Sequence, residues 1–137
     1  MSIKVFILVY SGDPLDYTKF RHTALHFEFP NGSTCAMHIV GSPGIFRFQP
    51  KDDYNPEQSR QLVCRIPVAH LQDWITEDTV RGLITRTPVK NGEMDWNCQN
   101  WVGDALARMV SSGYLTAAQR ASAIDLMTDA CLEAQDE

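Results

Sequence analysis

A turn that contains proline constrains this chain more than any other feature of its sequence. Two strand-like stretches, residues 21–29 and 33–40, flank the turn sequence Pro-Asn-Gly at 30–32. A two-residue Asn-Gly turn would require a backbone N–H from Pro30, which proline lacks. The sequence therefore predicts a three-residue loop with Gly32 in the left-handed conformation, in a hairpin whose paired residue numbers add up to 62.

This register places three histidines on one face of the predicted hairpin. His38 lies opposite Ala24, so it shares a face with His22 and His26. Diagonal neighbours in a hairpin are about 7–8 Å apart at the backbone, so His38 can hydrogen-bond to His22 or to His26. His22 and His26 lie about 13 Å apart along the strand, too far to chelate one metal ion together. Histidines bonded within the protein are therefore favoured over a zinc site, and neither a metal nor another cofactor is expected.

Local periodicity predicts the remaining elements of an α+β domain, an antiparallel β-sheet packed against helices. Further strands are expected at 3–10, 44–48 and 61–68, with a polar loop at 49–59. Helices are expected at 69–75, 76–87, 97–111 and 116–134. Their boundaries follow from the N-caps Thr76, Asn97 and Thr116, and from Pro88 and Gly113 at two of the ends. Five residues of the last helix are expected to point inward: Ala123, Leu126, Met127, Ala130 and Cys131.

Length and composition exclude several classes of protein. A chain of 137 residues with 44% hydrophobic residues fits one domain, 1–137. A net charge of −5 without a Lys/Arg cluster argues against a nucleic-acid partner. The longest apolar run, Val5 to Tyr10, is too short to span a bilayer, and no signal peptide precedes it. A cytoplasmic protein without a stable membrane anchor is expected, and the sequence leaves its oligomeric state open.

The four cysteines are expected to be free thiols, because they are widely spaced and form no Cys-x-x-Cys pair. Cys35, Cys64 and Cys131 fit apolar patterns and are expected to be inert. Cys98 differs, because it falls in the first turn of a predicted helix. Free N–H groups and the helix dipole favour a thiolate there, so a lowered pKa is expected for Cys98.

A nucleophilic thiol requires a nearby base and a third polar group that orients the base. The histidine face can supply both, because the helix that begins at Cys98 carries an apolar stripe and should pack on the sheet. The sequence therefore predicts a Cys-His-His constellation.

The segments that carry these residues resemble a known family. Arg21-His22-Thr23-Ala24-Leu25-His26, the hairpin with His38, and Asn97-Cys98-Gln99-Asn100-Trp101-Val102 are similar to lecithin:retinol acyltransferase-like thiol enzymes. These enzymes form a permuted branch of the papain-like, NlpC-type superfamily. The resemblance implies a papain-like fold with Cys98 as the nucleophile at a helix N-terminus, His22 as the general base and His38 as the residue that orients it.

The chain departs from the family pattern at three places. His26 stands where the family usually has an aromatic residue, and Gln99-Asn100 replaces its usual Glu-His pair. The acidic end at 133–137 replaces the apolar anchor of the membrane-bound members. Five residues are candidates for contact with substrate: His26, Trp96, Asn97, Gln99 and Trp101.

The predicted function is cysteine-dependent acyl transfer on a small-molecule or acyl substrate. Cys98 would attack an amide, ester or thioester, and water or another nucleophile would receive the acyl group. Hydrolase, acyltransferase and cyclase activities all remain open. Two alternatives are a catalytically silent module of the same fold that binds a small molecule or a protein, and a metal-dependent hydrolase.

Overall fold

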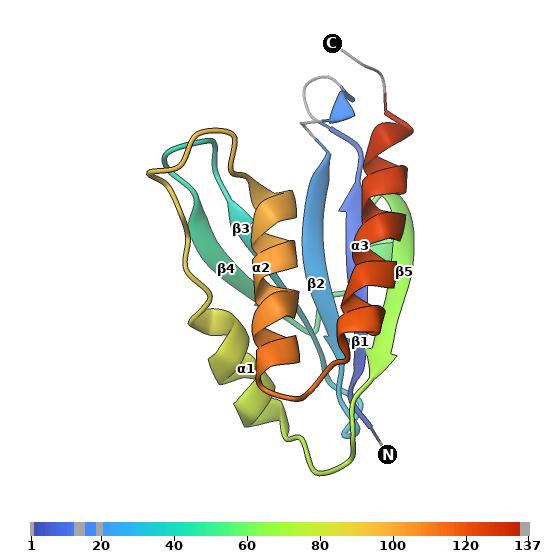
Figure 1. Cartoon of the computed structure of the whole chain (residues 1–137). Coiled ribbons are helices and arrows are strands. Elements are labelled where there is room, and N and C mark those ends of the chain that lie inside the picture. Colours follow the sequence, from blue (N-terminus) through green and yellow to red (C-terminus); the bar gives the residue numbers. More distant parts are fainter. Residues whose placement is uncertain (1, 13–15, 19–20, 135–137) are drawn as a thin grey trace.

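A five-stranded sheet forms the centre of the molecule, with neighbouring strands antiparallel in the order β4-β3-β2-β1-β5 (Figure 1). The structure is a computed structural model that describes residues 2–12, 16–18 and 21–134; the end of the predicted acidic segment, 135–137, lies outside these ranges. The strands are β1 (Lys4–Tyr10), β2 (His22–Glu28), β3 (Thr34–Val40), β4 (Arg47–Asp52) and β5 (Leu62–His70). The expected α+β class is confirmed.

The β2–β3 hairpin has the predicted turn and register. The N–H of Gly32 donates to the carbonyl of Phe29 at 3.0 Å, and Phe29 in turn donates to the carbonyl of Ser33 at 2.9 Å. Gly32 has a φ of +89°, the left-handed conformation that glycine adopts without steric cost. The pairs Leu25–Met37 and Glu28–Thr34 both add up to 62, so the register prediction is confirmed.

Two of the predicted elements, a strand and a helix, are wrong. The fourth predicted strand, at 44–48, is displaced: Gly41 and Gly44 have positive φ and form a turn, and β4 begins at Arg47 and continues through Gln49 into the predicted polar loop. Pro50 lies within this strand; β4 is at the edge of the sheet, where the N–H that proline lacks is not needed. The helix predicted at 69–75 is absent: β5 runs to His70, because pairing with β1 continues to Lys4.

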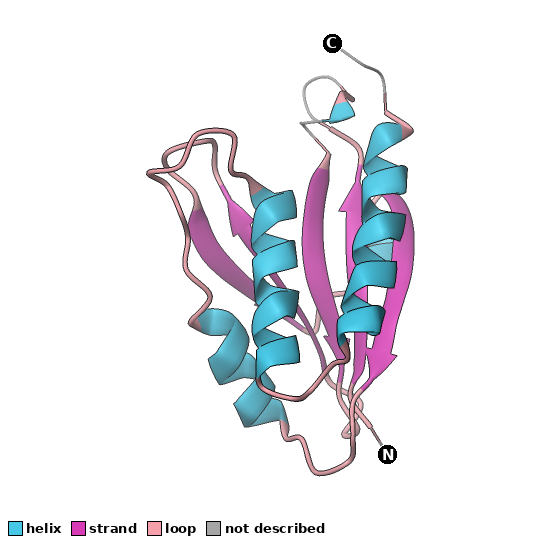
Figure 2. Cartoon of the chain, in the orientation of Figure 1, coloured by secondary structure: helices cyan, strands magenta, loops and turns pink. Residues whose placement is uncertain are grey.

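Three helices cover one face of the sheet (Figure 2): α1 (Glu77–Thr85), α2 (Cys98–Ser111) and α3 (Ala117–Leu132). α2 packs on β2 and β3, and α3 packs on β5 and β1. All three expected N-caps are confirmed, and Gly113, with a φ of +81°, follows the end of α2. Five residues were expected to point inward from α3, and the prediction is wrong only for Leu126. This side chain is half exposed, beside a buried stripe formed by the other four.

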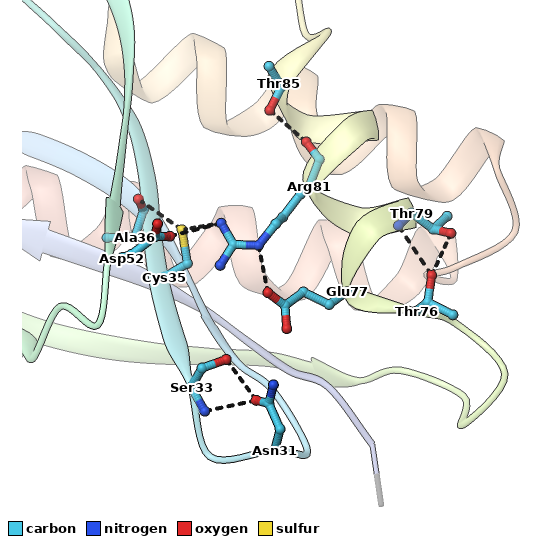
Figure 3. A network of polar contacts seen from close by, with 10 residues as sticks. All are labelled: Asn31, Ser33, Cys35, Ala36, Asp52, Thr76, Glu77, Thr79, Arg81 and Thr85. Carbon is cyan, nitrogen blue, oxygen red and sulfur yellow. Dashed lines mark hydrogen bonds and ion pairs between the residues drawn. The ribbon is translucent and has the colours of Figure 1, made fainter.

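The short helix α1 is attached to the β3–β4 ladder by Arg81 (Figure 3). The guanidinium donates to Asp52 at 2.9 Å and to Glu77 of its own helix at 2.8 Å. The side chain of Thr76 accepts from the N–H of Thr79 and so begins the helix. These contacts fix the end of the molecule that holds the hairpin turn, opposite the end where β2 begins (Figure 1).

Part of the other face of the sheet packs against the loop between β4 and β5, which carries the 3₁₀ turn η2 (Pro56–Gln58). Alternate positions of β1 and β2 point to this face, where Leu8, Tyr10 and Ala24 pack with Tyr54 of the loop in a small apolar cluster. His22, His26 and His38 share its strand parity, so they begin on the face away from the helices.

Candidate active site

Two of the three histidines form a hydrogen-bonded relay. Nε2 of His22, the first residue of β2, lies 2.7 Å from Nδ1 of His38 on β3. Nε2 of His38 lies 3.0 Å from Oε1 of Gln49, its direct partner on β4. Of the two partners that the sequence left open for His38, the structure selects His22. We call these three residues the histidine relay.

The relay defines which nitrogen is basic. An amide oxygen only accepts, so Nε2 of His38 carries its proton and Nδ1 of a neutral His38 is an acceptor. Nε2 of His22 therefore donates to His38, and Nδ1 of a neutral His22 holds the free lone pair. Gln49 thus fixes the tautomers of both rings.

Burial keeps the relay neutral. It lowers the pKa of His22 to about 4, and the positive charges of His38 and Lys51 add to the effect. It also lowers the pKa of His38, although the hydrogen bond to Gln49 opposes the change. At neutral pH the His22 ring is a base ready to accept a proton.

Cys98 is the first residue of α2, as predicted. Oδ1 of Asn97 accepts from the N–H of Gln99 at 2.9 Å, and Oδ1 of Asn100 accepts from the N–H of Asn97 at 3.0 Å. This reciprocal capping box fixes where the helix begins. The apolar stripe that starts at Cys98 faces the sheet, and the thiol is consequently buried, with 8% of the residue exposed.

The expected lowering of the Cys98 pKa is wrong. Burial raises the pKa of this thiol, and this effect exceeds the opposing hydrogen bonds from the N–H and hydroxyl of Thr23 and from the N–H groups of Cys98 and Gln99. The sulfur donates to the carbonyl of Arg21 at 3.8 Å. The first turn of α2 does favour a thiolate, but removal from water outweighs it.

Cys98 and the two histidines of the relay, His22 and His38, line one cavity of about 780 Å³, which we call the thiol cavity. It lies at the end of the sheet where β2 begins, β3 ends and α2 begins (Figure 1). Its walls are mainly hydrocarbon, including Ile39, Pro43, Phe46 and Trp96. The cavity can therefore hold an apolar group of substrate beside a thiol and an imidazole.

Of the five predicted contact residues, Trp96 and Asn97 line the thiol cavity. Within the described part of the chain, the other three lie outside its lining. His26 is 1% exposed, and its Nε2 lies 3.1 Å from the carbonyl of Tyr54. Gln99 donates to the carbonyls of Thr18 and Arg21, which ties α2 to the segment before β2. Trp101 is fully buried in the core against Phe48.

The sequence analysis missed two residues of this site. Gln49 was assigned to a loop; extending the strand past Pro50 would have paired it with His38. Thr23 was expected only as a strand residue, yet its buried hydroxyl favours the thiolate form of Cys98. A Thr one residue after a candidate base is a weak sequence signal, because threonine is common in strands.

The four cysteines are free thiols. Burial raises the pKa of Cys35 to about 11 and that of Cys131 to about 12, which fits their expected inertness. No three His, Cys, Asp or Glu side chains are grouped to hold a metal ion in the ranges that the structure describes. Within those ranges, none of the helices combines the length and apolarity that a bilayer span requires.

Comparison with known proteins gives one match. A family profile described as "Family of unknown function (DUF6540)" matches residues 5–116, which include every residue of the relay and Cys98. No curated protein and no solved structure matches the chain.

Proposed function

The chain belongs to the DUF6540 family of unknown function, and we propose that it is a cysteine-dependent acyl-transfer enzyme with Cys98 as nucleophile and His22 as general base. One observation carries the proposal: a neutral imidazole, oriented through bonds of 2.7 and 3.0 Å by two further residues, lines the same cavity as a thiol at a helix N-terminus. Nucleophile, base and orienting group are the three parts that covalent acyl transfer needs.

The chemistry begins from a neutral thiol and a neutral imidazole. The Cys98 proton moves to Nδ1 of His22 as the sulfur–carbon bond forms at the acyl carbonyl. The bond to the leaving group then breaks, and His22 returns the proton to that group. Water or another nucleophile next attacks the thioester through the same base, which releases the acyl product and restores the Cys98 thiol.

His38 and Gln49 are positioning residues in this scheme. When His22 gains a proton, its Nε2–H continues to donate to His38, so the imidazolium is held in the orientation of the base. The backbone N–H of Cys98, one of the first in α2, has no helical partner and can stabilise the oxyanion. A strand histidine beside a helix-terminal cysteine is also what the resemblance to NlpC-type enzymes implies, so the proposed fold is papain-like.

A specific observation supports a second candidate, a silent binding module. The hydrogen-bond partner of the Cys98 sulfur is the carbonyl of Arg21, and burial keeps the thiol protonated. A protein that only holds a ligand in the thiol cavity needs neither thiolate nor base. The two candidates differ in whether a covalent acyl group ever appears on Cys98.

Acyl trapping tests the proposal. The protein is mixed with p-nitrophenyl hexanoate, whose short apolar chain suits the thiol cavity, quenched in acid and mapped by mass spectrometry. We expect one acyl group on Cys98, its loss in Cys98→Ala, and unchanged labelling in Cys64→Ala, because Cys64 lies on β5 outside the cavity lining. Labelling of Cys64 with none on Cys98 would overturn the enzymatic assignment in favour of the binding module.

A further inference from the structure

A second cavity borders the histidine relay from the face of the sheet away from the helices. It has a volume of about 370 Å³ and we call it the reverse-face cavity. Ala24 and Ala36 form its floor, and three residues, His22, His38 and Gly41, line both this cavity and the thiol cavity. His22 and His38 therefore lie at the boundary between the two cavities.

The two cavities differ in chemistry. The thiol cavity is mainly hydrocarbon, whereas the reverse-face cavity is lined mainly by hydrogen-bond donors. Beside the relay these are Tyr10, Ser11, Lys51, Tyr54, Ser59 and Gln61. None of the described residues in this lining is a carboxylate, so its one full charge, on Lys51, is positive.

Lys51 lies on the same face of β4 as Gln49 and lines the reverse-face cavity together with His22 and His38. It lies two residues after Gln49 on β4, and residues two apart on a strand share a face. Its ammonium lies 5.4 Å from the centre of the Tyr54 ring. Beside the larger effect of burial, its positive charge also lowers the pKa values of His22 and His38.

Two tyrosines supply a further donor. The hydroxyls of Tyr10 and Tyr54 lie 2.7 Å apart, so one proton is used between them and one O–H remains to donate. Burial and the neighbouring Tyr54 raise the pKa of Tyr10, so the Tyr10 hydroxyl stays protonated. One cation and a set of neutral donors without an acidic side chain match an oxyanion of a ligand.

We propose that the reverse-face cavity binds a carboxylate or phosphate group, and that this group belongs to the leaving group or the acceptor of the acyl-transfer reaction. The second part rests on the proposed function. The atom that receives a proton from His22 must lie beside that ring, so the rest of its molecule can extend into the cavity that the ring borders. The acyl part would occupy the thiol cavity, on the other side of the relay.

Binding of inorganic phosphate and of acetate tests the proposal without a known substrate. The ring resonances of His22 and His38 are followed by NMR as each anion is added, at constant ionic strength. We expect saturable shifts with at least one anion, and at least a tenfold weaker affinity in Lys51→Gln. Lys90→Gln is the matched control, because Lys90 pairs with Glu93 and Asp104 away from the cavity, and it should bind as the wild type does.

The outcomes separate the two proposals. If only one of the two anions binds, that anion identifies the kind of oxyanion, phosphate or carboxylate, that the cavity accepts. Shifts that do not saturate, or equal affinity in Lys51→Gln and the wild type, would overturn the inference even if Cys98 becomes acylated. Saturable binding that needs Lys51 and is retained in Cys98→Ala supports the anion site. If such binding is found but Cys98 is never acylated, the anion site stands and only the enzymatic function is refuted.

Discussion

Cys98 and His22 are both neutral for the same physical reason. Removal from water disfavours the charged form of either group, so burial raises the pKa of the thiol and lowers that of the imidazole. The pair therefore starts as thiol and imidazole rather than as thiolate and imidazolium. In the proposed reaction the proton would therefore have to move during attack, and the free Nδ1 of His22 is the atom that would receive it.

The pH profile of Cys98 alkylation follows from its surroundings. With iodoacetamide, we expect the midpoint for Cys98 to lie above the ordinary thiol pKa of about 8.5, because burial raises it. Thr23→Val removes a hydroxyl that favours the thiolate and should raise the midpoint further. Thr85→Val is the control, since its hydroxyl bonds only to its own helix. A midpoint below that of a free cysteine would contradict this account.

The pH dependence of stability follows from His22. Its pKa is about 4 in the folded protein and about 6.5 when unfolded, so between these values the unfolded chain binds the proton and stability falls as pH falls. The unfolding free energy should drop by about 1 kcal/mol from this residue between pH 7 and 5.5. Urea titrations at both pH values measure the drop, which His22→Gln should reduce by a similar amount. An equal drop in the variant would show that His22 is not buried and neutral.

The positions at which the helices and strands begin and end determine whether the Cys98 thiol and the two histidines line the same cavity. The capping box of α2 puts Cys98 in the first turn, and the three-residue hairpin loop puts His22 and His38 on one face. Both features depend on local chemistry that a sequence displays: a cap residue, and a proline that cannot donate.

The Asn97 cap is tested by substitution. Asn97→Ala should lower the unfolding free energy by about 1 kcal/mol, because the N–H of Gln99 loses its acceptor. Asn97→Asp keeps an acceptor and should restore most of the loss. Chemical denaturation measures both variants. If Asn97→Ala were as stable as the wild type, the cap would contribute nothing to placing Cys98.

Features that depend on partners distant in sequence were predicted less well. The path of β4 past Pro50 is set by pairing with β3 at the sheet edge, and the strand at 69–70 by pairing with β1. Neither partner is visible in a local pattern, so Gln49 was missed as the third member of the relay. Burial was missed in the same way: the helix start argued for a low Cys98 pKa, but the packing around the sulfur reversed the direction.

At the scale of the whole molecule, the sheet separates two environments and the relay joins them. Helices cover one face of the sheet (Figure 2), and the apolar thiol cavity lies where α2 begins. The polar reverse-face cavity lies on the other face, where Tyr54, Ser59 and Gln61 of the loop after β4 contribute to its lining. The walls of the thiol cavity come from the segments around Gly41 and Trp96, which are far apart in sequence. The candidate residues Cys98, His22 and His38 could therefore be identified from motifs, whereas the cavities required the folded chain.

The central claim is that His22 acts as the base for Cys98, and the pH dependence of single-turnover acylation by p-nitrophenyl hexanoate tests it most directly. Between pH 5.5 and 8, the wild type should acylate Cys98 with His22 already neutral, and His22→Gln should be at least a hundredfold slower while remaining folded by circular dichroism. Thr85→Val, whose hydroxyl bonds within α1 and which lines neither cavity, is the control and should remain within a few-fold of the wild type. Acylation of Cys98 in His22→Gln at the wild-type rate would contradict the account.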